Sequence, residues 1–148
     1  ALGGGLGQVS VNAYFWNALK KIHSPIQFLA GMSLTFEQAN LDHCQYYLKI
    51  FRQIGDNDSA NILEKIYLDE IRHVRHGLHW MRELTQEEDD FSNHVKNLPH
   101  PLTLARAKGK ILDIDGRKQA GLHDKYIEQL SLFSHSKGRP PRVFFLVY

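Results

Sequence analysis

The chain is poor in cysteine and has no long apolar run. Cys44 is its single cysteine among 148 residues, which excludes an internal disulfide framework and a metal site built from several thiolates. No stretch of about 18 uninterrupted apolar residues occurs, so no segment is predicted to span a membrane. The glycine-rich start lacks the charged region of a secretory signal. Together these absences predict a cytoplasmic protein without a membrane partner.

Motifs of several common enzyme classes are missing as well. The sequence contains no P-loop, no GxGxxG and no Ser/His/Asp arrangement with a supporting motif. Its composition, 43% hydrophobic and 23% charged, is that of an ordinary globular domain. The length suits one domain that buries a real core. These features identify no substrate.

Negative charge is unevenly distributed along the chain. No acidic residue occurs between Leu2 and Phe36, so Glu37 is the first carboxylate of the sequence. Residues 1–90 hold 8 basic and 12 acidic residues, whereas residues 91–148 hold 10 and 4. A basic C-terminal region suits either nucleic acid or an acidic surface of the same molecule. Packing over the chain's own acidic bundle is the simpler of the two explanations.

The first half of the chain has the periodicity of long amphipathic helices. Residues 8–23 form one candidate helix. Ser24 and Pro25 then supply an N-cap and a first helical residue, and the helix that they begin is predicted to run to Ile54, closed by Gly55. After the turn 55–59, a second helix extends to about Leu84. Because the turn is short, we expect the two long helices to be antiparallel neighbours.

The second half of the chain is more broken. Three further helices are predicted, over residues 91–98, 101–110 and 116–133, and Pro99 and Pro101 separate the first two. Residues 134–142 are basic and contain Pro and Gly, so they are not predicted to be regular helix. We therefore expect a helical domain over residues 1–133 and a basic tail over residues 134–148 that packs on it.

One motif on the second long helix indicates chemistry. Glu70 and His73 fall on the same face as Leu63, Tyr67 and Val74, so a carboxylate and an imidazole lie within an apolar stripe. A buried carboxylate must be paired, protonated or bound to metal. The Glu-x-x-His spacing converges both side chains on one ion, as in dinuclear carboxylate bundles. Solvated helices also carry this spacing by chance, but the apolar face argues against that reading.

The first long helix offers the complementary ligand. Glu37 lies in its apolar stripe with Leu34 and Leu41, and it is expected to converge with Glu70 and His73 on one metal ion. Asn40, one turn further along the helix, is placed to orient the Glu37 carboxylate. Asp69 is expected to be buried and to hydrogen-bond a His or Arg of a neighbouring helix. In this way it would support the metal ligands.

Other side chains are weaker candidates. His43 points away from Glu37 around its helix, and His76 and His79 flank the ligand face, so we favour structural roles for all three. Tyr47 and Tyr67 are more simply explained as core aromatics than as redox groups. Cys44 is expected to be a small buried hydrophobic residue.

Several stretches resemble an uncharacterised bacterial branch of the ferritin-like superfamily of di-iron carboxylate proteins. The similar residues are 34–43, Gly55 and Asp56, 66–74, 106–109, Arg117 with 120–122, and 136–141. The resemblance implies an all-α, ferritin-like antiparallel helical bundle, or its C-terminal half. It also implies a site in which Glu37 is the lone Glu of the third bundle helix, Glu70 and His73 are the ExxH of the fourth, and Asp69 supports the ligands.

The resemblance covers only half of that superfamily's metal site. A second Glu and a second ExxH would come from the first two bundle helices, and no acidic residue precedes Glu37 to supply them. Two arrangements remain open: a homodimer that shares the site, or a longer N-terminal region, which we favour because family members are longer and the chain starts without Met. A monomer that binds one ion weakly is the remaining alternative.

Two functions follow from different properties of the chain. The first is a metal-binding protein with a dinuclear iron or manganese site and oxidoreductase or oxygenase chemistry on an unidentified substrate, which is a small molecule or a macromolecule. The second is a metal-free helical interaction module that binds RNA through its basic residues. The basic residues assigned to RNA binding are Lys108, Lys137, Arg139 and Arg142. Iron or manganese bound in stoichiometric amount would distinguish the two.

Overall fold

The computed structural model describes residue 8, residues 13–86 and residues 89–133, and all regular structure in these ranges is helical. The expected all-α class is therefore confirmed. The predicted helix over 8–23 is present as the shorter α1, Tyr14–Leu19, and residues 9–12 lie outside the described part. The basic tail, residues 134–148, and its predicted packing on the helical domain also lie outside it.

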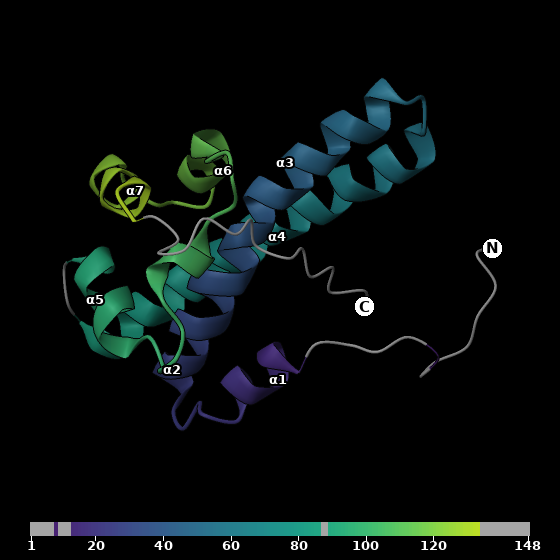
Figure 1. The fold of residues 1–148 in the computed structure, drawn as a ribbon. Helices are drawn as coiled ribbons and strands as arrows, with labels where there is room; N and C mark the ends of the chain where they lie inside the picture. The colour runs from purple at the N-terminus through teal and green to yellow at the C-terminus, as the bar shows by residue number, and fades with distance from the viewer. Residues whose placement is uncertain (1–7, 9–12, 87–88, 134–148) are drawn as a thin grey trace.

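Two long antiparallel helical runs form the framework of the molecule. The first comprises α2 (Pro25–Phe28), η1 (Leu29–Glu37) and α3 (Gln38–Gln53), and the second is α4 (Asn57–Thr85). Ser24 caps the first run as predicted, since its side chain accepts a hydrogen bond from the Gln27 amide at 3.3 Å. Figure 1 shows that the hairpin of α3 and α4 projects away from the other helices at its tip.

The tip of the hairpin is closed by two turn residues. Gly55 has a φ of +81°, a backbone conformation that costs glycine little and other residues more. The Asp56 side chain then accepts a hydrogen bond from the Ser59 amide at 3.0 Å and so caps α4. The predicted turn between two antiparallel neighbours is confirmed.

The π-helical geometry of η1 was not predicted. Its nine residues end at Glu37 and lead directly into α3 without a break in the helical run. π-Helical hydrogen bonding is rare, occurs mostly as single turns, and is frequent at functional sites. The residues from Leu29 to Glu37 include no Pro, and their apolar periodicity is also compatible with an α-helix, which explains why the sequence does not reveal the difference.

The C-terminal half differs from expectation in two places. The helix predicted over 91–98 is present as α5 (Asp90–Asn97). Only a short 3₁₀ turn, η2 (Leu104–Ala107), replaces the helix predicted over 101–110. The helix predicted over 116–133 is two helices, α6 (Ile114–Gln119) and α7 (Asp124–Ser131). They are separated at Gly121, whose φ of +93° ends the first of them.

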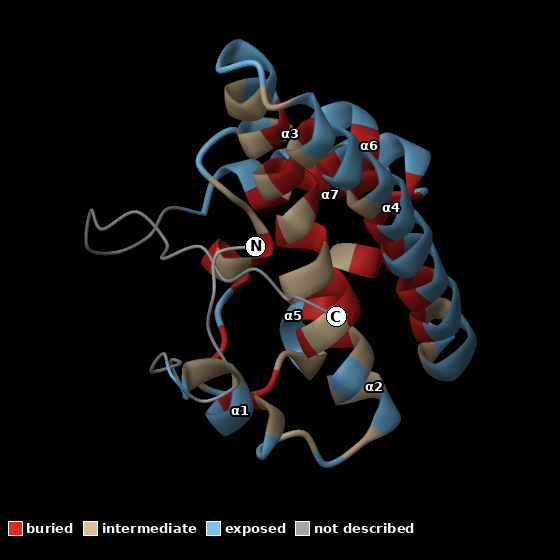
Figure 2. Cartoon of the chain, turned by 90° about the vertical axis from the view of Figure 1, so that its right-hand side faces the viewer, coloured by how far each residue is buried: buried red, intermediate tan, exposed pale blue. Residues whose placement is uncertain are grey.

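The core lies where α5, α6, α7 and η2 cover one side of the long hairpin near its base (Figure 1). Buried residues line the inner faces of the two runs, while the tip and the outer face of α4 are exposed (Figure 2). The predicted stripe of the first run is buried at Ala30, Leu34, Leu41, Cys44 and Leu48. None of the described helices combines the length and the apolar character needed to cross a membrane.

A buried ion pair attaches the C-terminal segments to α3. Asp42 accepts hydrogen bonds from the backbone amides of Gly109 and Asp113, each at 2.6 Å, and from both terminal nitrogens of Arg117, at 2.5 and 3.0 Å. Arg117 is fully buried and also donates to the carbonyl of Ala107 at 3.0 Å. One carboxylate of the hairpin therefore holds the loops and helix that follow η2.

Candidate metal centre

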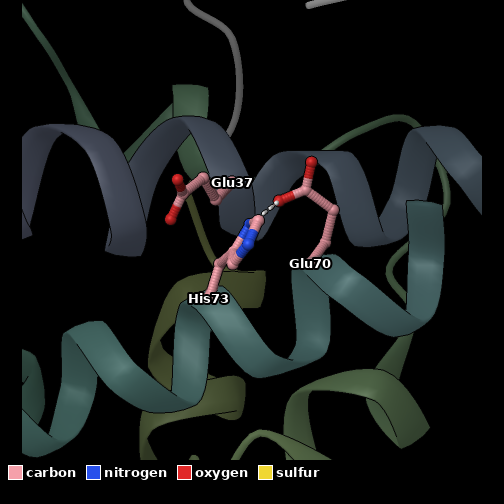
Figure 3. A group of neighbouring side chains, drawn as sticks. All are labelled: Glu37, Glu70 and His73. Carbon is pink, nitrogen blue, oxygen red and sulfur yellow. Dashed lines mark hydrogen bonds and ion pairs between the residues drawn. The ribbon is translucent and has the colours of Figure 1, made fainter. Parts of the chain in front are cut away.

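Glu37, Glu70 and His73 converge between the two long runs. Each offers one ligand atom, and these three atoms all lie within 4.8 Å of one another. Glu37 is the last residue of η1, and the other two lie one turn apart on α4. Figure 3 shows the imidazole of His73 directed from α4 toward the run that carries Glu37, between the two carboxylates in this view. The predicted convergence in space is therefore present.

The register of the hairpin explains which residues meet. Positions equally distant from Gly55 face each other: Asn40 and Glu70 are each 15 residues from it, and Glu37 and His73 are each 18. Glu37 is thus level with His73 rather than with Glu70. The side chains of Glu70 and His73 come from successive turns, and so the three groups still share one space.

Glu70 lies in an environment that disfavours its charge. Its side chain is 2% exposed, and its carboxylate accepts a hydrogen bond from the Asn40 amide at 2.9 Å and faces Nδ1 of His73 at 3.4 Å. Burial raises its pKa above the ordinary value, the Asn40 hydrogen bond opposes the rise, and the Glu37 carboxylate adds to it. A cation between Glu37 and Glu70 would stabilise the ionised form of both.

Asn40 and Cys44 occupy the α3 side of the site. The Asn40 amide donates to one oxygen of the Glu70 carboxylate, whereas the sequence predicted that it would orient the Glu37 carboxylate. Cys44 is buried, as predicted, and burial together with the charge of Glu70 raises its thiol pKa to about 12. The thiol therefore stays protonated in the metal-free chain, and Cys44 is not among the three convergent ligands.

The expectation for Asp69 is wrong. Its side chain is 53% exposed and pairs with Arg72 on its own helix instead of with a neighbouring helix. The reason is geometric, because each residue of an α-helix is rotated by about 100° from the one before it. With Glu70 directed into the hairpin, Asp69 is directed outward. The polar side chain of the neighbouring helix that contacts Glu70 is that of Asn40.

A close backbone approach sets the distance between the two runs beside the site. Ser33 and Gly77 are each 22 residues from Gly55 and lie one helical turn beyond Glu37 and His73. A Cβ atom added at Gly77 would lie 2.2 Å from Cβ of Ser33. Only glycine at this position allows α4 to approach η1 so closely, and this approach brings the three candidate ligands within reach of one another.

The other candidates lie apart from this group. Among the described residues, no further set of three potential ligands converges. His76 and His79 are exposed and make edge contacts with Trp80. Tyr67 donates to Asp113 at 2.7 Å, and burial raises its pKa, so it remains a neutral phenol. These residues do not extend the candidate site.

Two of the weaker candidates on α3 are also explained by packing. Tyr47 is partly buried and makes an edge contact with the ring of Tyr46. His43 is partly buried, and burial lowers its pKa below the ordinary value. Both observations agree with the structural roles that the sequence favoured.

A second polar cluster was not anticipated from the sequence. His94 of α5 is fully buried, with Nδ1 2.7 Å from the hydroxyl of Tyr126 and Nε2 close to Thr35 and Ala30 of η1. Burial lowers the pKa of His94 to about 4, so its imidazole is neutral at neutral pH. The available signal was its position on the helix predicted over 91–98, one turn from Phe91 and Leu98 on the apolar side.

Comparison with known proteins adds a family but no activity. The sequence model of a family described as "Protein of unknown function (DUF455)" matches residues 1–128. No curated protein matches the chain, and neither does any solved structure. The chemistry of the site must therefore be inferred from its own residues.

Proposed function

We propose that this chain, which belongs to the DUF455 family, is a metal-binding protein that holds iron or manganese at Glu37, Glu70 and His73 and supports oxidative chemistry. The single observation that carries this proposal is the convergence of three ligand atoms within 4.8 Å around a buried carboxylate. Two ligand atoms on opposite sides of an ion, with bonds of about 2.0–2.2 Å, are about 4.0–4.4 Å apart. Small rotations of exposed His73 and half-buried Glu37 would close the remaining difference.

The donor set suits these metals. Two carboxylates and one imidazole provide the oxygen and nitrogen ligands that iron and manganese accept, and the convergent group includes no thiol that would favour softer ions. The burial of Glu70 would be costly in a site that stays empty, because its partners among the described residues are an amide and an imidazole. A bound cation would supply the missing positive charge.

We further propose that the complete site is dinuclear. A di-iron or di-manganese bundle takes a Glu from each of two helices and a Glu-x-x-His from each of two others. The convergent residues comprise one Glu and one Glu-x-x-His, which is half of this set. The other half would come either from a second copy of the chain or from a longer N-terminal region.

Asn40 and His73 have different roles in the proposed site. Bound iron or manganese would supply one-electron redox chemistry toward O₂. Asn40 holds one oxygen of Glu70 and leaves the other facing His73, which fixes the carboxylate relative to the imidazole. The side chain of His73 is 44% exposed, so the site meets solvent on the His73 side.

The test is metal binding by the purified chain. We expect about one Mn²⁺ or Fe²⁺ per protomer by elemental analysis after anaerobic loading, and a large loss of affinity in Glu70→Gln. Glu64→Gln is the matched control, because Glu64 is an exposed carboxylate on the same helix that pairs with Arg52. Equal binding by Glu70→Gln and Glu64→Gln would contradict the proposal.

The dinuclear form has its own measurement. Sedimentation of the loaded chain, with metal quantified for each protomer, separates a dimer that shares two ions from a monomer that holds one. A stable monomer with two tightly held ions would refute the half-site argument, since its three ligands are too few for both ions. Oxygen consumption by the iron-loaded chain then tests the oxidative chemistry.

RNA binding is the weaker alternative. Three of its four predicted residues lie outside the described part of the chain. The fourth, Lys108, donates to the carbonyl of Ser131 at 2.6 Å, so its ammonium group already has a partner within the protein. RNA binding through this region remains a prediction, and no contact among the described residues favours it.

A further inference from the structure

The π-helical geometry of η1 is rare and needs contacts that stabilise it against relaxation to an α-helix. A π turn holds about one residue more than an α turn, so its relaxation to α-helical bonding would rotate the residues on one side of it by about 100°. Ser33, packed against Gly77, lies inside η1, and Glu37 is its last residue. Relaxation between these two positions would turn the Glu37 carboxylate away from Glu70 and His73.

The side chains of Thr35 and His94 both contact the carbonyl of Ala30, near the start of η1. The Thr35 hydroxyl donates to the carbonyl of Ala30 at 2.7 Å, across the five-residue spacing that defines a π turn. Nε2 of His94 lies 3.1 Å from the same carbonyl and 2.9 Å from the Thr35 oxygen. His94 belongs to α5 and therefore joins the π turn to a different helix.

The protonation state of His94 follows from these contacts. A carbonyl oxygen only accepts hydrogen bonds, so Nε2 carries the proton that is directed at Ala30 and Thr35. The opposite nitrogen, Nδ1, faces the hydroxyl of Tyr126 at 2.7 Å, and the two rings stack within 7° of parallel. His94 is fully buried, and the Tyr126 hydroxyl also donates to Oε1 of Gln38 at 3.2 Å, so the contact with the Ala30 carbonyl is the one that assigns the proton to Nε2.

We propose that His94 is a positioning residue for the metal site: through Ala30 and Thr35 it holds η1 in its π-helical form and so keeps Glu37 directed at Glu70 and His73. This inference rests on the proposed function only where it predicts a change in metal affinity. The mechanical part concerns the chain alone, because it requires that the π turn loses its geometry when the imidazole donor is removed.

The experiment compares variants that separate this role from general stability. His94→Leu removes the donor at similar volume, and His94→Gln retains an N–H at nearly the reach of Nε2. Thr35→Val removes the hydroxyl from the other side of the same contact and serves if His94→Leu fails to fold. Leu130→Ala, a buried α7 substitution expected to cost about 2–5 kcal/mol, is the control for lost stability.

Two measurements are made on each variant. Mn²⁺ affinity is read from the electron paramagnetic resonance signal of free Mn²⁺, and hydrogen exchange is followed for the amides of residues 30–37 in the metal-free chain. We expect His94→Leu and Thr35→Val to weaken Mn²⁺ binding by about 10-fold or more, as the loss of a supporting group typically does. We also expect them to accelerate exchange in this segment, and His94→Gln to restore most of both properties.

The outcomes separate the two proposals. If Leu130→Ala weakens Mn²⁺ binding and accelerates exchange of residues 30–37 as much as His94→Leu does, the effect is one of stability and the positioning role is overturned. If the unmodified chain binds no Mn²⁺, the proposed function fails. The exchange data alone then decide whether His94 holds the π turn, since equal exchange in His94→Leu and the unmodified chain would overturn that as well.

Discussion

The contact between Gly77 and Ser33 allows a sharp test of how the two runs are held at the site. In Gly77→Ala the new methyl group would lie 2.2 Å from Cβ of Ser33, whereas carbon atoms in contact are about 3.5–4.0 Å apart. Overpacking of this kind costs about 1–3 kcal/mol, and the better helix propensity of Ala returns about 1 kcal/mol. The net loss is then about 0–2 kcal/mol, and because both atoms are fixed to backbone we expect its upper end, about 2 kcal/mol.

The reciprocal substitution should repair the damage. Ser33→Gly removes both atoms that would clash and leaves Cα of residue 33 at 3.6 Å, an ordinary contact distance. Alone it should cost about 0.5–1 kcal/mol through backbone entropy. In the double variant a single Cβ atom again lies between the helices, now on α4, so its stability should return to within about 1 kcal/mol of the unmodified chain.

The assay is a double-mutant cycle by urea unfolding, with Mn²⁺ affinity measured on the same four proteins. We expect an interaction free energy of about 2–3 kcal/mol. Mn²⁺ binding should weaken in Gly77→Ala, because the runs separate one turn from the ligands, and recover in the double variant. Additive free energies would refute the claim that the Gly77–Ser33 approach sets the helix spacing.

Three further predictions concern separate groups. Asp42→Asn should lower the free energy of unfolding by about 3–5 kcal/mol in denaturant titrations, because it leaves the buried charge of Arg117 unpaired; a loss below about 1 kcal/mol, typical of a surface pair, would contradict this. The pKa of His94 is lowered from 6.5 to about 4, so its contribution to stability is complete above pH 6.5 and is lost as the pH falls toward 4. The stability advantage of the unmodified chain over His94→Gln should shrink by about 3 kcal/mol between pH 7 and pH 4, and a constant difference would rule out a neutral buried imidazole. Asn40→Ala should weaken Mn²⁺ binding by about 10–100-fold, whereas Asp69→Ala should leave it unchanged, and isothermal titration of both distinguishes the residue that touches Glu70 from the one that does not.

The candidate ligands could be predicted because helical periodicity and one short turn determine them. The apolar stripes placed Glu37, Glu70 and His73 on inner faces, and the turn at Gly55 made the two runs adjacent and antiparallel. The level of each residue along the hairpin follows from its distance to the turn, because the two runs are antiparallel. Glu37 is in fact level with His73, at equal distance from the turn.

The errors have equally local causes. Asp69 was assigned to the interior from its position next to Glu70, although neighbouring residues of a helix are directed to different sides. The break between α6 and α7 depends on the positive φ of Gly121. A single glycine within an apolar pattern is not enough to predict that conformation. The contacts of Asp42 and His94 span 32 or more residues of sequence, so helical periodicity contained no information about them.

The ion pair between Asp42 and Arg117 also constrains how sequences of this kind can diverge. A change of either residue alone leaves a charge in the interior, while replacement of both by apolar residues of similar volume is often neutral or stabilising. Substitution of Asp42 and Arg117 together is therefore tolerated better than substitution of either residue first. In an alignment of the family, the columns of these two residues are expected to vary together, with Gly109 retained where the carboxylate is retained, because a side chain there would contact Cβ of Asp42 at 2.8 Å.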